Sequence, residues 1–232
     1  MKKYYAMETA GRETNLYIYG DITSWEWTES DVSSYTLSKT LEELDADIIN
    51  VYINSYGGEV AEGLAIYNAL KRHKAKVKTV CDGFACSIAS VIFMAGDDRV
   101  MNNASLLMVH NAWTRAEGNA QGLRKTADDL DKITQASVNA YLEQVTIGEE
   151  ELKAMLDAET WVTPMEALEK GFATEITGAP LNFAAPSQSA RREVYAKLTA
   201  SRPVAPKNPE KLQEKENIPL KLIAALLKTK GE

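Results

Sequence analysis

Histidine and cysteine are scarce in this sequence, with two of each among 232 residues. No apolar run reaches the about 20 residues that a membrane-spanning helix needs, and the basic N-terminus is not followed by the apolar segment of a secretory signal. The formal net charge of -7 argues against the clustered positive field that nucleic-acid phosphates require. We therefore expect a cytoplasmic protein that binds neither nucleic acid nor a membrane.

The cysteines and histidines also make a metal site improbable. Cys81 and Cys86 fall in apolar surroundings and are interpreted as small buried residues rather than as a disulfide. No set of histidines, cysteines and acidic residues has the spacing of zinc ligands. The sequence predicts no metal and no organic cofactor.

What the sequence does contain is an alternation of strand and helix patterns. Strands are predicted at residues 15–20, 47–54, 76–81 and 105–110, and helices at 30–44, 60–71, 87–94 and 164–170. This order predicts an α/β fold of βαβ units with a largely parallel sheet. A long amphipathic helix at 119–146 is expected to project from the domain or to pack against another subunit.

The composition changes near Gly178. We expect one domain at residues 1–178, a flexible linker at 179–217 rich in Ala, Pro, Ser and charged residues, and a short amphipathic helix at 218–232.

His110 is the more informative histidine. It follows the apolar strand at 105–109, so it should emerge at the carboxyl edge of the sheet, where α/β proteins bind ligands. A buried structural role is equally compatible with that position. His73, in the basic run at 71–74, is interpreted as part of a solvated helix end.

Ser87 stands between a predicted strand and a predicted helix. A hydroxyl there would benefit from the unpaired N–H groups and the positive potential of a helix start. The alternative is a simple N-cap, a role in which serine is common. Ser90, one turn later, is expected to pack in the apolar interior.

The segment 54–58 (Asn-Ser-Tyr-Gly-Gly) is predicted to form a glycine turn between a strand and a helix. Backbone N–H groups of such a turn can point into a cavity. The N–H groups of Gly57 and Ile88 are the natural pair of donors for an oxyanion hole, although an ordinary tight turn is the alternative.

Taken together and in this order, these segments resemble the Clp protease proteolytic subunit family from about Leu16 to Ile176. The family motifs Asn-Ser-Pro-Gly-Gly, Gly-x-Ala-Ala-Ser-Met and Met-Ile-His correspond to residues 54–58, 83–88 and 108–110. The resemblance implies a Clp protease/crotonase-like fold, with Ser87 as nucleophile and His110 as general base. It also implies a protein or peptide substrate and a homo-oligomer, as a heptameric ring or double ring whose rings meet through the long helix.

The acid of the implied triad is assigned to Asp157. In the family this acid precedes an aromatic residue and a helix that ends in glycine, and Trp161 and Gly171 match those features. The spacing to the aromatic residue leaves Glu159 as a rival.

Several departures resemble the head maturation proteases of tailed phages and prophages. Tyr56 replaces the family's proline, and the segments 19–25, 111–113 and 159–161 are similar to that branch. This implies processing of capsid or scaffold proteins in the cytoplasm of a bacterial host, and leaves an unfoldase ATPase partner open. The alternatives are a non-catalytic assembly protein on the same fold and a crotonase-like acyl-CoA enzyme.

Overall fold

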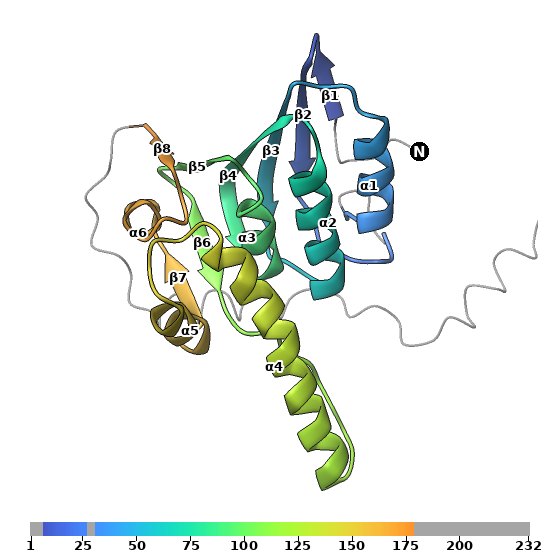
Figure 1. Cartoon of the computed structure of the whole chain (residues 1–232), viewed down its shortest axis with the longest axis vertical. Helices are drawn as coiled ribbons and strands as arrows, with labels where there is room; N and C mark the ends of the chain where they lie inside the picture. The colour runs from blue at the N-terminus through green and yellow to red at the C-terminus, as the bar shows by residue number, and fades with distance from the viewer. Residues whose placement is uncertain (1–6, 27–30, 179–232) are drawn as a thin grey trace, which may run out of the picture. The chain divides into compact units, whose positions relative to one another are not determined.

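The computed structural model describes residues 7–26 and 31–178. This part contains one eight-stranded sheet and six helices (Figure 1). The strands are β1 Met7–Ala10, β2 Glu13–Ile18, β3 Ile48–Ser55, β4 Lys76–Cys86, β5 Asp98–Asn102, β6 Leu106–Val109, β7 Thr160–Val162 and β8 Glu175–Thr177. The helices are α1 Ser34–Glu43, α2 Val60–Arg72, α3 Ile88–Phe93, α4 Ala120–Leu142, α5 Glu149–Asp157 and α6 Pro164–Glu169. The predicted α/β class is confirmed.

The sheet is parallel through its centre, in the order β1-β2-β3-β4-β5-β8. The central strand β4 is 11 residues long and pairs with three strands, with β3 along one side and with β5 and β6 along the other. Its first half pairs with β5 at residues 78–81, and its last residues, 84–86, pair with β6. Strand β7 then adds to β6 in the antiparallel direction. The carboxyl ends of β3, β4 and β6 therefore meet at one edge of the sheet.

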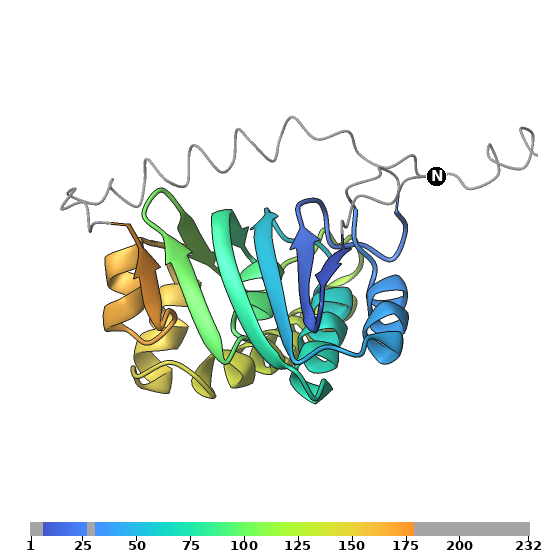
Figure 2. The same cartoon turned by 90° about the horizontal axis from the view of Figure 1, so that it is seen from above.

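The core forms where the sheet packs against its helices. Strand β3 has Ile49, Val51 and Ile53 fully buried, which is the alternation expected of a strand with one face inward. Figure 2 shows α1 and α2 along the same face of the sheet, and Leu37 of α1 and Ile66 of α2 are also fully buried. Burial of each such side chain contributes about 1.5–3 kcal/mol to folding.

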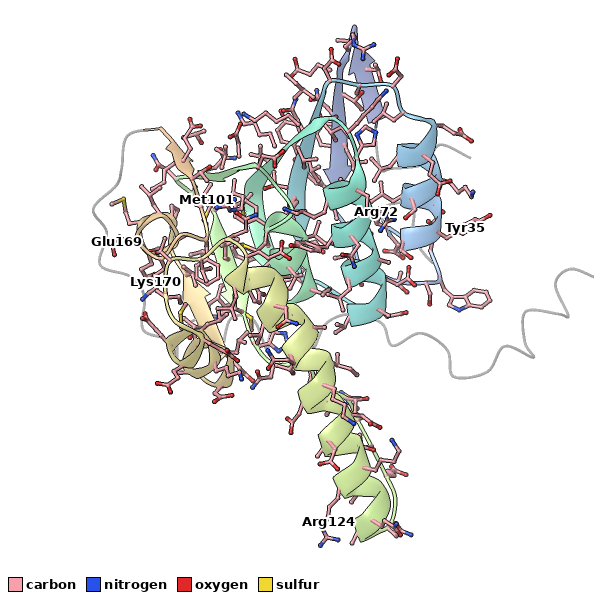
Figure 3. The ribbon with its side chains drawn as sticks, viewed as in Figure 1. Tyr35, Arg72, Met101, Arg124, Glu169 and Lys170 are labelled. Carbon is pink, nitrogen blue, oxygen red and sulfur yellow. The ribbon has the colours of Figure 1, made fainter. Side chains whose placement is uncertain are left out.

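Helix α4 is the element that departs from this compact packing. It runs for 23 residues, and only Val138, Ala140 and Tyr141 of it are buried. Its N-terminal part extends away from the sheet (Figure 1), and Arg124 lies at the far end (Figure 3). The long projecting helix is thus confirmed.

Local sequence signals set several boundaries. The Thr163 side chain and Glu166 form a reciprocal capping box at the start of α6. Gly171, with a φ of 81°, follows the helix, in the left-handed conformation common after a helix end.

The structure differs from the sequence expectations mainly in short elements. The predicted strand at 76–81 continues to Cys86. The strands β1, β5, β7 and β8 were not predicted, because three to five residues carry too little periodicity to identify a strand. The nine-residue helix α5 was not predicted either. The predicted linker at 179–217 and helix at 218–232 lie outside the described residues and stay predictions.

Candidate active site

The strand register brings Ser87 and His110 together. Cys86 of β4 lies opposite Met108 of β6, and the Ser87 N–H donates to the Met108 carbonyl at 2.8 Å. Ser87 therefore directly follows β4, and His110 directly follows β6. The structure brings both into the lining of one small pocket, whose residues are Val60, Ser87, Ile88, Val91, His110, Asn111, Ala112, Ser137 and Tyr141.

Ser87 has an unusual backbone conformation, with φ 57° and ψ −130°. Residues other than glycine rarely adopt a positive φ, and holding one in such a conformation typically costs about 1–3 kcal/mol of folding free energy. Ser87 precedes α3 at the N-cap position, but its side chain makes no capping hydrogen bond. The N-cap alternative is therefore not the role of this hydroxyl, and a strained strand-to-helix turn is the geometry that exposes a nucleophilic serine.

The glycine turn lies directly beside Ser87, because Ser55 at the end of β3 is opposite Ala85 of β4. Gly57 has a φ of 99°, and a Cβ on it would lie 2.8 Å from both the Ser87 Cβ and the Cys86 carbonyl oxygen. Only glycine fits this position without moving the backbone of the serine turn.

The backbone N–H groups near Ser87 differ in whether they already donate a hydrogen bond within the protein. Ile88 is the first residue of α3, so its N–H has no partner within the helix. The Gly57 N–H donates to the Ser55 Oγ at 3.1 Å. Gly57 C=O and Glu59 N–H both pair with Ile22, so the N–H of Gly58 between them points to the opposite side of the strand. The Gly57 N–H predicted as an oxyanion donor is thus already engaged, and Gly58 offers the neighbouring N–H.

His110 is largely buried, and its Nε2 atom has no hydrogen-bond partner in the described part of the chain. Burial lowers the pKa of the imidazole below its ordinary value of 6.5. The negative charge of Glu159 and hydrogen bonding to the Asn111 backbone oppose this and raise the pKa. The ring is therefore biased toward the neutral form, which can accept a proton.

The two acidic candidates occupy different positions around His110. Strands β6 and β7 are antiparallel with Val109 opposite Thr160, so continuing the register puts Glu159 opposite His110. Asp157 ends α5, and its Oδ1 accepts a hydrogen bond of 2.7 Å from the Asn111 Nδ2. The register thus favours the rival Glu159, while Asp157 as the orienting acid stays a prediction.

Two side chains have other roles than those expected. Ser90 is fully buried but hydrogen-bonded, with its Oγ 2.7 Å from the Tyr141 hydroxyl. The His73 Nδ1 accepts from the Ala75 N–H at 3.0 Å and its Nε2 lies 3.2 Å from the Leu44 carbonyl oxygen. His73 therefore connects the ends of α1 and α2 instead of standing on a solvated face.

A larger apolar cavity of about 570 Å³ adjoins the pocket. It shares Val60 and Ala112 with the Ser87 pocket and extends between α2 and α4, where Trp113 and Ile133 line it. Nothing in the sequence indicated this cavity, because its walls come from three distant segments.

Other kinds of site were sought in residues 7–26 and 31–178. No three of the His, Cys, Asp and Glu residues in this part are grouped so as to hold a metal ion. None of the helices there has the length and apolar character to span a membrane.

Comparison with known proteins gives a consistent result. Residues 4–180 match the family model described as Clp protease. A relative from Deinococcus radiodurans named ATP-dependent Clp protease proteolytic subunit is 35% identical over 130 residues, 55% of this chain and 64% of the relative. A Bacteroides fragilis protein of the same name is 32% identical over 152 residues, 63% of this chain and 73% of the relative. The chain thus spans just under two thirds of the Deinococcus relative's length.

The fold and the pocket together define an α/β protein with a serine and a histidine at the carboxyl edge of a parallel sheet. With the family model matched over most of its length, the chain belongs to the Clp protease family, a family of serine peptidases. The resemblance inferred from the three motifs is confirmed.

Proposed function

We propose that this chain is a serine endopeptidase that hydrolyses peptide bonds through an acyl-enzyme on Ser87. The observation that carries the proposal is the shared pocket. Ser87, in a strained turn and with a hydroxyl that does not cap α3, lines the same small cavity as His110, whose Nε2 has no hydrogen-bond partner among the described residues. Family membership supports the same chemistry.

The reaction needs only groups of the chain and water. The Ser87 Oγ bonds to the peptide carbonyl carbon while its proton passes to the His110 Nε2. The C–N bond then breaks, and the imidazolium gives its proton to the leaving amine. Water bonds to the acyl carbon, passes a proton to His110, and the Ser87 oxygen departs and takes that proton back. No metal or organic cofactor enters these steps.

The negative oxygen of the tetrahedral intermediate requires backbone donors. The Ile88 N–H supports this role because it opens α3 beside the nucleophile. The second donor is either the predicted Gly57 N–H, after release from Ser55, or the Gly58 N–H, which faces away from Ile22. Both choices keep the oxyanion at the same turn.

The acid is tested by comparing two isosteric changes. Because the charge of Glu159 acts on His110 while Asp157 binds Asn111, Glu159→Gln should lower kcat by about 10²–10⁴-fold, as loss of an orienting carboxylate does. Asp157→Asn is expected to cost less than about tenfold, the range of losing one exposed hydrogen bond. Steady-state peptide hydrolysis measures both, and the reverse ranking would restore Asp157 as the acid.

The pH dependence follows from the burial of His110. Only neutral imidazole accepts the Ser87 proton, so kcat/KM should fall as the pH drops through the pKa of His110 in the free enzyme. Since burial lowers that pKa, the inflection is expected below pH 6.5. A pH profile of kcat/KM tests this, and an inflection above the ordinary histidine value would contradict the buried, neutral base.

The finer assignments are part of the same proposal. The chain works as a homo-oligomeric ring, as a heptamer or double ring, on protein or peptide substrates in a bacterial host cytoplasm, and processes phage capsid or scaffold proteins. The apolar cavity beside the pocket supports a preference for an apolar substrate side chain. An unfoldase ATPase partner remains open in this proposal.

The proposal is tested by incubating the full chain with an unfolded protein substrate, with and without prior treatment by a fluorophosphonate. We expect cleavage that the reagent abolishes. An assembled oligomer that neither cleaves nor reacts would favour the non-catalytic assembly protein, and binding of an acyl-CoA thioester would favour the crotonase-like enzyme.

A further inference from the structure

Two buried hydroxyl groups lie directly beneath the Ser87 turn. Ser90 belongs to α3, one turn after Ser87, and Tyr141 belongs to α4 near its C-terminal end. Ser90 is 0% exposed and Tyr141 is 1% exposed. Their hydroxyl oxygens are 2.7 Å apart, so two helices far apart in the sequence are joined at this point.

The direction of these hydrogen bonds follows from counting protons. The Ser90 Oγ lies 2.6 Å from the Ser87 carbonyl oxygen and 3.3 Å from the Met108 carbonyl oxygen. Carbonyl oxygens only accept, so the single hydroxyl proton of Ser90 is donated to them. The Tyr141 hydroxyl must then donate to the Ser90 Oγ. The network thus runs in one direction, from Tyr141 through Ser90 to the backbone of the serine turn.

Both accepting carbonyls belong to the catalytic geometry. One is the carbonyl of Ser87 itself, whose φ of 57° is strained. The other is that of Met108, which also accepts the Ser87 N–H and lies two residues before His110. A strained conformation persists only where its surroundings hold it, and a buried, fully paired hydrogen-bond network is rigid.

We propose that Ser90 and Tyr141 are positioning residues that hold the Ser87 turn and the end of β6 in register, so that the Ser87 hydroxyl faces His110. Tyr141 also lines the pocket that Ser87 and His110 share. The inference rests on the proposed peptidase function for its effect on catalysis, while the hold on the backbone stands by itself.

The test uses Ser90→Ala and Tyr141→Phe, which remove one hydroxyl each. Two controls remove hydroxyls from the buried residues Thr79 and Tyr67 elsewhere in the fold, of which the Tyr67 hydroxyl is only partly buried. Thr79→Val deletes the group that donates to the Phe93 carbonyl at the opposite end of α3 (2.7 Å), and Tyr67→Phe deletes the donor to Glu143 (2.8 Å).

Two readouts are compared between the test variants and the controls, and the loss of Tm of each variant is measured beside them. Hydrogen exchange of peptides covering residues 84–91 reports the turn without any need for activity, and it should be faster in Ser90→Ala and Tyr141→Phe than in either control. Hydrolysis of a fluorogenic peptide should show kcat lowered by about 10- to 100-fold with KM unchanged, the cost of a misplaced catalytic group. The double variant should be no slower than Ser90→Ala, because both changes break one network.

Exchange at 84–91 equal to that of the controls would overturn the proposal, as would a kcat within twofold of wild type or a loss that the controls share. A wild-type chain that hydrolyses nothing and resists the fluorophosphonate would instead defeat the peptidase proposal, and the exchange comparison would still decide whether the two hydroxyls hold the turn.

Discussion

Replacing Ser87 with alanine is expected to lower kcat for peptide hydrolysis by about 10⁴–10⁶-fold, the range seen when a serine nucleophile is removed. The variant lacks the only oxygen that can form the acyl-enzyme in this mechanism, so fluorophosphonate labelling should disappear with the activity. Folding should be retained, because the Ser87 side chain makes no capping hydrogen bond and alanine keeps the Cβ that packs beside Gly57.

The matched control for this change is Ser38→Ala, a serine of α1 remote from the pocket. It should label and cleave like the wild type. Fluorophosphonate labelling and peptide hydrolysis measure the effect, and melting temperatures show that both variants fold. Labelling that persists in Ser87→Ala would mean that another residue is the nucleophile.

Substituting Gly57 with alanine is expected to have the next largest effect, lowering kcat/KM by about 10²–10³-fold, as loss of oxyanion stabilisation does. The new Cβ would lie 2.8 Å from the Ser87 Cβ and from the Cys86 carbonyl oxygen, so the turn and the nucleophile must move apart. The positive φ of 99° adds strain for alanine.

Gly11→Ala is the control that separates the steric clash of the new Cβ from the backbone strain of a positive φ. Gly11 also has a positive φ, 67°, but a Cβ there would meet no atom within 4 Å. Backbone strain should cost Gly57→Ala at least as much stability as Gly11→Ala, because a φ of 67° lies in the left-handed region that L-residues can occupy and 99° lies outside it. Only Gly57→Ala should lose catalysis. If the two variants hydrolyse a fluorogenic peptide equally well, the glycine turn does not adjoin the reacting groups as described.

The sequence was sufficient for those parts of the protein that depend on local pattern. The alternation of strand and helix predicted the parallel centre of the sheet, and the turn at Ser87 and the strand before His110 were recognisable as motifs. Their meeting was predictable because parallel strands carry their carboxyl ends to one edge.

What the sequence could not supply was the register of strands too short to have a pattern. Strand β7 has three residues, yet continuing its antiparallel pairing with β6 by one residue puts Glu159, rather than Asp157, opposite His110. Linear spacing to Trp161 left both carboxylates open.

The hydrogen bonds of individual side chains could not be predicted from the sequence either. The Ser55 hydroxyl engages the Gly57 N–H, and Tyr141 of α4 reaches Ser90 of α3. In the sequence, Ser90 looked like a packing residue because its neighbours are apolar, and nothing indicated the partner 51 residues later.

The most direct test of the central claim is an experimental structure of the chain after reaction with a fluorophosphonate. We expect the phosphorus bonded to the Ser87 Oγ, one phosphonyl oxygen within about 3 Å of the Ile88 N–H and of a Gly57 or Gly58 N–H, and the His110 Nε2 within hydrogen-bonding distance of the Ser87 Oγ. A phosphonate on another residue, or an imidazole that stays out of reach of the modified serine, would contradict the account.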